Sequence, residues 1–289
     1  MKILLLGGCG YIGTRLFDEL HGDYDVVSVD LEWFGKTTEN NIKMDYDNLD
    51  SEFFLDFEVV ILVAGNSSVG MCKTLKPTHE NNVDNFINLL RRVHKSTKLI
   101  YASSSSLYSG LKNATENDIS YSPKCYYDLT KFEIDMYAQL SNRHFYGLRL
   151  GTVNGYSRNL RNDLMINKMY LSSQIYYSNP QISRPILDIN DLVRAVKAII
   201  EKGKYIRRGI YNIASFNSTV EEIVEQVGGE TGKLKIESEA VPTYDFSMDC
   251  SKFERTFDFK FQGTVRSILT DLKKINEATL INDRNESIR

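Results

Sequence analysis

Apolar runs of strand length alternate with helical patterns over the first half of the chain. Between the runs, apolar residues recur at helical spacing without proline, most clearly in the stripe from Phe86 to Val93. This rhythm is typical of β-α-β units and predicts a parallel sheet with helices on both faces. The expected strands are residues 3–6, 26–29, 59–63, 98–102 and 145–150, and the expected helices are 12–20, 81–94 and 126–140.

The pattern changes after Gly155, where a polar stretch rich in asparagine and arginine begins. Order returns at residues 185–200 and 209–214. With 289 residues, the chain is long enough for one large or two modest domains. We expect residues 1–153 to form a first domain to which residues 186–213 return, and residues 154–289 to supply mainly a smaller C-terminal region.

Composition narrows the functional classes. The formal net charge is −3 and no cluster of Lys and Arg stands out, so neither nucleic acid nor an anionic membrane is an expected partner. The four cysteines are far apart, without a CxxC pair or a histidine at metal spacing, which favours free thiols and no metal site. No apolar stretch approaches the roughly 20 residues of a membrane span, and no signal-peptide pattern is present. We therefore expect a cytoplasmic protein.

Three glycines, Gly7, Gly10 and Gly13, follow the first expected strand and open the first expected helix. A dinucleotide site needs glycines in this context, for a tight turn and for close approach of the backbone to a pyrophosphate. The second expected strand ends at Asp30, at the distance where an acid can bind the adenosine ribose. Because Asp30 repels a 2′-phosphate and the next residues, Leu31, Glu32 and Trp33, include no arginine to bind one, NAD is favoured over NADP. The alternatives are that the glycines form an ordinary tight turn before a helix and that Asp30 is an ordinary turn residue at a strand end.

The segment 126–131, YYDLTK, contains a second group of candidate functional residues. On a helix Tyr127 and Lys131 are four residues apart and share a face, whereas Tyr126 has Thr130 at that distance. A tyrosine titrates near 10, so it acts as a base only where a positive charge favours its phenolate. Lys131 and an oxidised nicotinamide are candidates for that charge. The alternative is a surface Tyr–Lys pair, but the serine run in residues 101–108 favours the catalytic reading.

Taken in chain order, these motifs resemble the extended short-chain dehydrogenases/reductases, in the NAD-dependent epimerase/dehydratase family that acts on nucleotide sugars. The resemblance implies a Rossmann-type doubly wound parallel sheet and a smaller C-terminal substrate-binding region. It implies a catalytic Ser104, Tyr127 and Lys131. It further implies that NAD is bound by Gly7, Gly10, Tyr11, Ile12, Gly13, Asp30, Leu31, Asp45, Tyr46, Val63, Ala64, Gly65, Asn82, Ala102, Ser103, Tyr127 and Lys131, and the nucleotide diphosphate sugar by Ser104, Ser105, Thr152, Arg161 and Arg184.

The chain departs from the family pattern at several positions. Ser105 and Ser106 stand where the 4,6-dehydratases carry Asp and Glu, so dehydration lacks its acid and base. Many members have Asn at the position of Thr152 and His at that of Asp188. Arg161, in the polar loop, either clamps a diphosphate or lies in solvent.

These observations predict an NAD-dependent nucleotide-sugar epimerase of the 4-epimerase type. The alternative is a 4-ketoreductase or dehydrogenase of the same family, and a third possibility is an inactive NAD-binding regulator. The resemblance also implies a homodimer, formed through helix 126–140, in which Phe132, Met136 and Leu140 recur at four-residue spacing. Trp33 and Phe34 either lie near adenine or pack a loop.

Overall fold

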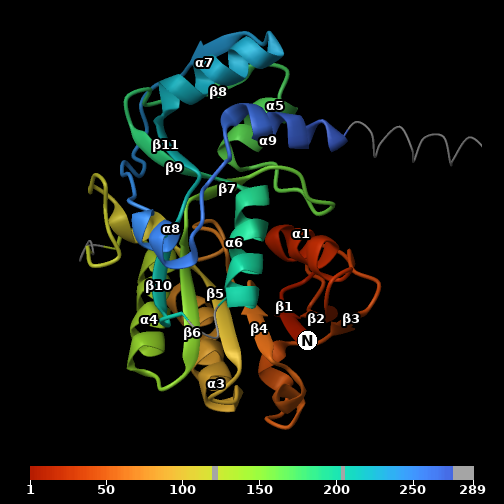
Figure 1. The fold of residues 1–289 in the computed structure, drawn as a ribbon. Helices are drawn as coiled ribbons and strands as arrows, with labels where there is room; N and C mark the ends of the chain where they lie inside the picture. Colours follow the sequence, from red (N-terminus) through yellow and green to blue (C-terminus); the bar gives the residue numbers. More distant parts are fainter. Residues whose placement is uncertain (119–122, 203–205, 276–289) are drawn as a thin grey trace, which may run out of the picture.

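The computed structural model describes residues 1–118, 123–202 and 206–275. Its central layer is a sheet of seven parallel strands in the order β10-β6-β5-β4-β1-β2-β3 (Figure 1). The chain runs outward from β1 to β3 and then crosses to β4 on the other side of β1, so the strand order reverses between β1 and β4. Ligands of such sheets bind at the carboxyl ends beside this reversal. The strands are β1 Lys2–Leu6, β2 Asp25–Asp30, β3 Asn41–Lys43, β4 Val59–Leu62, β5 Lys98–Ser104, β6 His144–Leu150 and β10 Gly209–Ile213.

Helices cover both faces of this sheet, which confirms the prediction of a doubly wound sheet. Ile3 and Leu5 of β1 enter the core under helices α1 (Tyr11–Leu20) and α6 (Ile189–Lys202). Leu4 and Leu6 enter the opposite core, under α3 (Asn85–Arg92) and α4 (Tyr126–Leu140). Side chains alternate across a strand, so a run that is apolar at every position requires cover on both faces.

The helix expected at residues 81–94 begins earlier than its periodicity indicated. Helix α2 (Leu75–His79) leads through a π-helical segment, η3 (Glu80–Asp84), into α3. Pro77 lies in the first turn of α2, where its missing N–H removes no helical hydrogen bond.

A smaller region stands above the carboxyl ends of the main strands (Figure 1). A three-stranded sheet in the order β11-β9-β7 and a two-stranded sheet, β12-β8, belong to this region. Helices α5, α7 and α9 contribute to its separate hydrophobic core. The bounds are β7 Thr152–Asn154, α5 Met165–Leu171, β8 Ile175–Tyr177, β9 Ser183–Asp188, β11 Phe216–Thr219, α7 Val220–Thr231, β12 Lys235–Glu237 and α9 Val265–Leu272.

The chain crosses between the two regions more than once. Strand β9 ends in the smaller region at Asp188, and α6 and β10 then return to the main sheet, where β10 pairs with β6. Helix α8 (Ser251–Phe257) also packs against β10 and α6. Three short 3-10 helices complete the described elements: η1 Tyr46–Asn48, η2 Phe53–Asp56 and η4 Ser105–Tyr108.

Across the described residues, we find no helix with the length and apolarity that a bilayer crossing requires. The same residues contain no group of three or more His, Cys, Asp or Glu side chains arranged to hold a metal ion.

Candidate active site

The glycine turn between β1 and α1 is crowded on one side and open on the other. Gly7 has φ +93°, and a Cβ there would lie 2.5 Å from the backbone nitrogen of Ala64. A Cβ on Gly13 would collide with the carbonyl oxygen of Gly7. Gly10, by contrast, is the extended N-cap of α1, and its Cβ would meet only the Gly7 oxygen, at 3.5 Å. The turn therefore requires glycine at its packed positions and leaves the N-terminus of α1 accessible.

The N-terminus of α1 has the features of an anion site. Gly10 provides no side-chain cap and the first turn contains no acidic residue, so the first backbone N–H groups lack a side-chain acceptor. Tyr11 contributes here through its backbone, because its hydroxyl donates to the Gly155 carbonyl at 2.8 Å and accepts from Asn167 at 3.4 Å. Ile12 is half-buried against the core.

Asp30 lies at the end of β2 beside the glycine turn. Its carboxylate accepts from the backbone of Cys9 at 3.1 Å and from that of Glu32 at 2.6 Å, which fixes its position. Leu31 is half-buried next to it. Glu32 adds a second carboxylate, whose pKa is lowered by a hydrogen bond from Asn41. Lys43 forms an ion pair with Glu32 at 3.4 Å, so of the two carboxylates Asp30 is the one expected to repel a 2′-phosphate.

The loops after β2 and β3 carry the remaining candidates on the adenosine side. Asp45 follows β3 and caps η1 by accepting from the Asp47 backbone at 3.0 Å. Tyr46 is buried in the core. Trp33 and Phe34 are 56% and 64% exposed, so they do not pack the loop that carries them.

The loop after β4 is tied to α4 by Asn82. The Asn82 side chain accepts from the Asn66 backbone at 2.8 Å and donates to Thr130 of α4 at 3.1 Å. Gly65 has φ +124°, and a Cβ there would lie 2.8 Å from the Asn82 Oδ1. Val63 and Ala64 precede this bend and are partly buried against the two cores.

Ser104 lies at the carboxyl end of β5, and Tyr127 and Lys131 lie in the first two turns of the adjoining helix α4. Ser104 ends β5 and caps η4, with its Oγ 2.9 Å from that of Ser106. Tyr127 occupies the first turn of α4, and the Lys131 Nζ lies 5.8 Å from the centre of its ring. Lys131 also donates to the Ala102 carbonyl of β5 at 2.8 Å. Ser103 and Ser105 are buried, and the Ser103 hydroxyl has no partner among the described residues.

Burial dominates the ionisation of this cluster. It lowers the pKa of Lys131 to about 8, against the opposing effect of the Asp135 carboxylate. It raises the pKa of the Tyr127 phenol, although a hydrogen bond with Ser104 and the charge of Arg161 lower it. Desolvation of the phenolate outweighs the neighbouring charges, so the net pKa of Tyr127 is raised, not lowered as expected for a tyrosine that acts as a base beside a lysine.

A cavity of about 360 Å³ opens between α5, β8 and β9. Arg184 and Thr152 line it, and Arg184 donates to the Thr152 hydroxyl and to that of Thr243, each at 3.5 Å. Within the described ranges, the Arg184 Nε is buried without a hydrogen-bond partner. Burial lowers the pKa of Arg184. The Asp245 carboxylate partly offsets this effect of burial, but a desolvated guanidinium with an unsatisfied Nε still makes the cavity suited to an anionic group.

The two arginines of the polar loop are already paired. Arg161 forms a two-pronged ion pair with Asp163, at 2.9 and 2.6 Å. Arg158 is bound in the same way to Asp18 of α1. Arg161 still faces Tyr127 closely enough to affect its pKa, whereas Arg158 links the loop to the outer side of α1.

Two residues near the candidate site carried no signal in the sequence. Thr243 joins the wall of the cavity from a segment far along the chain. The Tyr244 hydroxyl donates to the buried Asp128 carboxylate at 3.0 Å, directly beside Tyr127. Both belong to an irregular segment without periodicity, so only the folded chain brings them to the site.

The strand order and the glycine turn define a Rossmann-type dinucleotide-binding protein. A model described as the NAD dependent epimerase/dehydratase family matches residues 3–214. The chain belongs to this family. A search among curated proteins finds no match.

Solved structures with the same fold are sugar-nucleotide enzymes. The UDP-glucuronic acid 4-epimerase of Bacillus cereus, in complex with UDP-glucuronic acid and NAD, superposes with a TM-score of 0.81 at 23% identity, covering 95% of this chain and 100% of that one. The UDP-glucose 4-epimerase of Thermotoga maritima, with UDP-glucose, gives 0.81 at 19%, covering 96% and 100%. The dTDP-glucose 4,6-dehydratase of Bacillus anthracis, with NAD, gives 0.78 at 19%, covering 96% and 98%.

Proposed function

We propose that this protein is an NAD-dependent epimerase of nucleotide sugars that inverts the hydroxyl-bearing carbon at position 4. The observation that carries the proposal is the placement of Tyr127 and Lys131 one helical turn apart on α4, beside the strand end that holds Ser104. The cavity that contains the Arg184 guanidinium supports it, since a nucleotide diphosphate is an anion of suitable size.

The residues at the glycine turn fit NAD. A Cβ would fill the turn at Gly7 and Gly13, the uncapped N-terminus of α1 suits a pyrophosphate, and Asp30 suits the ribose hydroxyls. When bound, NAD accepts a hydride from the sugar and later returns it. We propose that the remaining candidates expected from the sequence, from Tyr11 to Ser103, also belong to the NAD site.

The side chains of the chain itself would move the proton. The Tyr127 phenolate takes the proton of the sugar 4-hydroxyl and returns it after the sugar has turned over in the site. The Ser104 hydroxyl donates a hydrogen bond to the reacting oxygen, and the Lys131 ammonium stabilises the phenolate. Arg184 and Thr152 hold the diphosphate. Arg161 leaves its ion pair with Asp163 and binds the substrate instead.

The 4-ketoreductase or dehydrogenase alternative uses the same proton transfer and differs only in whether the keto sugar leaves. Asp30 favours the epimerase, because an acid at the ribose favours NAD and many biosynthetic ketoreductases use NADPH. An inactive NAD-binding regulator has no physical need to keep Ser104, Tyr127 and Lys131 together.

We further propose that the protein is a cytoplasmic homodimer and that two regions of each chain bind different ligands. Residues 1–153, with α6 and β10, would hold NAD, and most of residues 154–289 would bind the substrate. The exposed side of α4 would form the dimer contact. Leu140 is 86% exposed there, and Phe132 and Met136 are half-buried on the same face.

The test begins with the purified chain. Denaturation should release NAD, and a panel of UDP-, GDP-, CDP- and dTDP-sugars should yield a 4-epimer detectable by NMR. Tyr127→Phe should reduce turnover by roughly 10²- to 10⁴-fold while NAD stays bound. Tyr126→Phe is the matched control, since Tyr126 is exposed and points about 100° away around the helix. An equal loss from both variants, or none from Tyr127→Phe, would contradict the assignment.

A further inference from the structure

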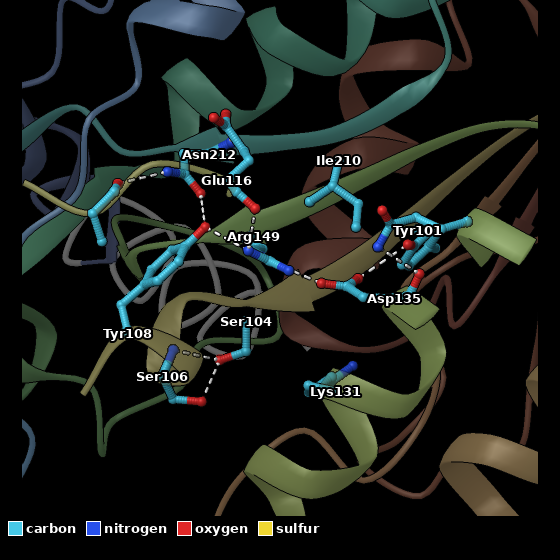
Figure 2. A network of polar contacts seen from close by, with 12 residues as sticks. Tyr101, Ser104, Ser106, Tyr108, Glu116, Lys131, Asp135, Arg149, Ile210 and Asn212 are labelled. Atoms are coloured by element: carbon cyan, nitrogen blue, oxygen red, sulfur yellow. Dashed lines mark hydrogen bonds and ion pairs between the residues drawn. The ribbon is translucent and has the colours of Figure 1, made fainter. Parts of the chain in front are cut away.

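An ion pair lies in the protein interior directly behind the candidate catalytic residues. The Arg149 Nε donates to the Asp135 Oδ2 at 2.8 Å, and both side chains are almost wholly buried, at 1% and 0% exposure. Figure 2 shows the pair between β6, which carries Arg149, and α4, which carries Asp135. Burying two charges is unfavourable unless their remaining hydrogen-bonding groups are satisfied. The partners that satisfy them therefore indicate what the pair holds in place.

The hydrogen-bond partners of Asp135 and of Arg149 lie in segments next to the candidate active site. The Asp135 Oδ1 accepts from the Tyr101 hydroxyl at 3.0 Å, and Tyr101 immediately precedes the residue whose carbonyl binds Lys131. The Arg149 Nη1 donates to the Tyr108 hydroxyl at 2.7 Å, and Tyr108 ends the 3-10 helix that Ser104 caps. The pair is thus hydrogen-bonded to β5 and to η4, which adjoin Ser104, and Asp135 itself lies on α4 with Lys131 (Figure 2).

Of the acidic residues of α4, Asp135 is the one whose charge acts on the Lys131 pKa, although Glu133 and Asp128 are closer to Lys131 in sequence. Asp135 and Lys131 are four positions apart, so their side chains share one face of the helix. The carboxylate raises the pKa of Lys131 against the lowering effect of burial, and the Cys72 thiol, from the loop after β4, acts in the same direction.

The other groups around this cluster are Tyr127 on α4, Tyr101 on β5 and Arg149 on β6, whose guanidinium binds the far side of the carboxylate. Among the described residues, the Lys131 Nζ has one hydrogen-bond acceptor, the Ala102 carbonyl, which is neutral. Asp135 is the carboxylate that favours the charged form of this ammonium.

We propose that Asp135, held by Arg149 and Tyr101, is a positioning residue that keeps Lys131 charged and directed toward Tyr127. The inference rests on the proposed function only in so far as Lys131 assists Tyr127 in catalysis. Its physical content, a carboxylate that maintains the protonation of a buried lysine, can be measured without any turnover.

The first experiment measures Lys131 directly in the full chain. Protein labelled with 13C at lysine Cε is titrated by NMR, and Lys131→Met assigns the signal. Asp135→Asn should lower the Lys131 titration midpoint by about 1 pH unit, the lower end of the effect of an opposite charge at close range. Asp135→Glu, which keeps the charge, should restore most of that shift. An unchanged midpoint in folded Asp135→Asn would overturn the proposal.

A second variant covers the case in which Asp135→Asn fails to fold because Arg149 is left unpaired. The double variant Asp135→Asn with Arg149→Met removes both charges. Proteins often tolerate the joint replacement of a buried ion pair by uncharged residues. Lys131 should again titrate lower than in the unaltered chain. A midpoint at the original value in this folded double variant would mean that the pair acts only through packing.

Turnover provides the last comparison. If Lys131 must be protonated, the rate falls as pH rises through its pKa, so Asp135→Asn should move this falling limb to lower pH by the NMR shift. A structural defect would lower the rate at every pH without moving the limb, and would overturn the proposal. An unaltered chain with the expected NMR behaviour but no turnover on any nucleotide sugar would refute the proposed function and leave this inference standing.

Discussion

Replacing Lys131 with methionine should make the protein more stable at neutral pH while it slows turnover. Burial lowers the pKa of Lys131 from 10.5 to about 8. At pH 7, where the lysine is charged in both states, this difference corresponds to about 3 kcal/mol of lost folding free energy. Methionine fills similar space without a charge but gives up the hydrogen bond to the Ala102 carbonyl, worth about 1 kcal/mol. The net expected gain is about 2 kcal/mol.

The pH dependence of that gain follows from linkage. Between about pH 8 and pH 10.5 the unfolded chain binds more protons at Lys131 than the folded chain does. The free energy of unfolding contributed by this group therefore rises with pH across that window, and the penalty present below it disappears. Lys131→Met lacks the group, so its advantage over the unaltered protein should shrink as pH increases from 8 to 10.5. Urea unfolding of both proteins at several pH values measures the difference.

A second buried lysine provides the control. Lys98 donates to two carbonyl oxygens at the end of α6, Ile199 at 2.8 Å and Ile200 at 2.6 Å. Burial also lowers its pKa. Lys98→Met leaves two acceptors unsatisfied at a helix C-terminus, where a cation is favourable, so it should lower stability. If Lys131→Met destabilises the fold at pH 7 as much as Lys98→Met does, Lys131 is a structural lysine and the reasoning fails.

Three further outcomes follow from the same geometry. Asp30→Gly combined with Leu31→Arg should shift the binding preference from NAD toward NADP, measured by calorimetry; equal binding of both cofactors by the unaltered chain would contradict the assignment. Leu140→Arg should convert a dimer into a monomer in light scattering at micromolar concentration, and an unaltered chain that is already monomeric would refute the dimer. Arg184→Met should raise KM for the nucleotide sugar at least tenfold with bound NAD unchanged, since it removes the guanidinium of the cavity.

The main sheet could be predicted because its signals are local. The run from Ile3 to Leu6 is apolar at every position, which only a strand covered on both faces explains. Strand β3 was missed because Asn41–Lys43 is three residues long and nearly polar throughout. The smaller region was not divided into elements, since its short strands pair only through distant partners such as Phe216 and Ile186.

The same distinction between local and distant signals applies to the site. Gly7, Tyr127 and Lys131 were recognised by spacing within a single turn or helix, where chain geometry fixes the neighbours. Arg149 and Asp135 belong to different elements, and nothing in the apolar run around Arg149 marks it as the partner of a buried acid. Spacing alone also could not show that burial outweighs charge in setting the Tyr127 pKa.

The hydroxyls that follow Ser104 favour epimerisation over dehydration. Elimination of water needs an acid and a base beside the sugar, and a carboxyl pair can serve where two serine hydroxyls at neutral pH cannot. Ser105 is buried, and the Ser106 Oγ already lies in hydrogen-bonding contact with that of Ser104, 2.9 Å away. These groups can orient a sugar oxygen but cannot accept its proton. We infer that Tyr127 is the proton acceptor in this cluster, and that the same residue donates a proton back to the sugar oxygen.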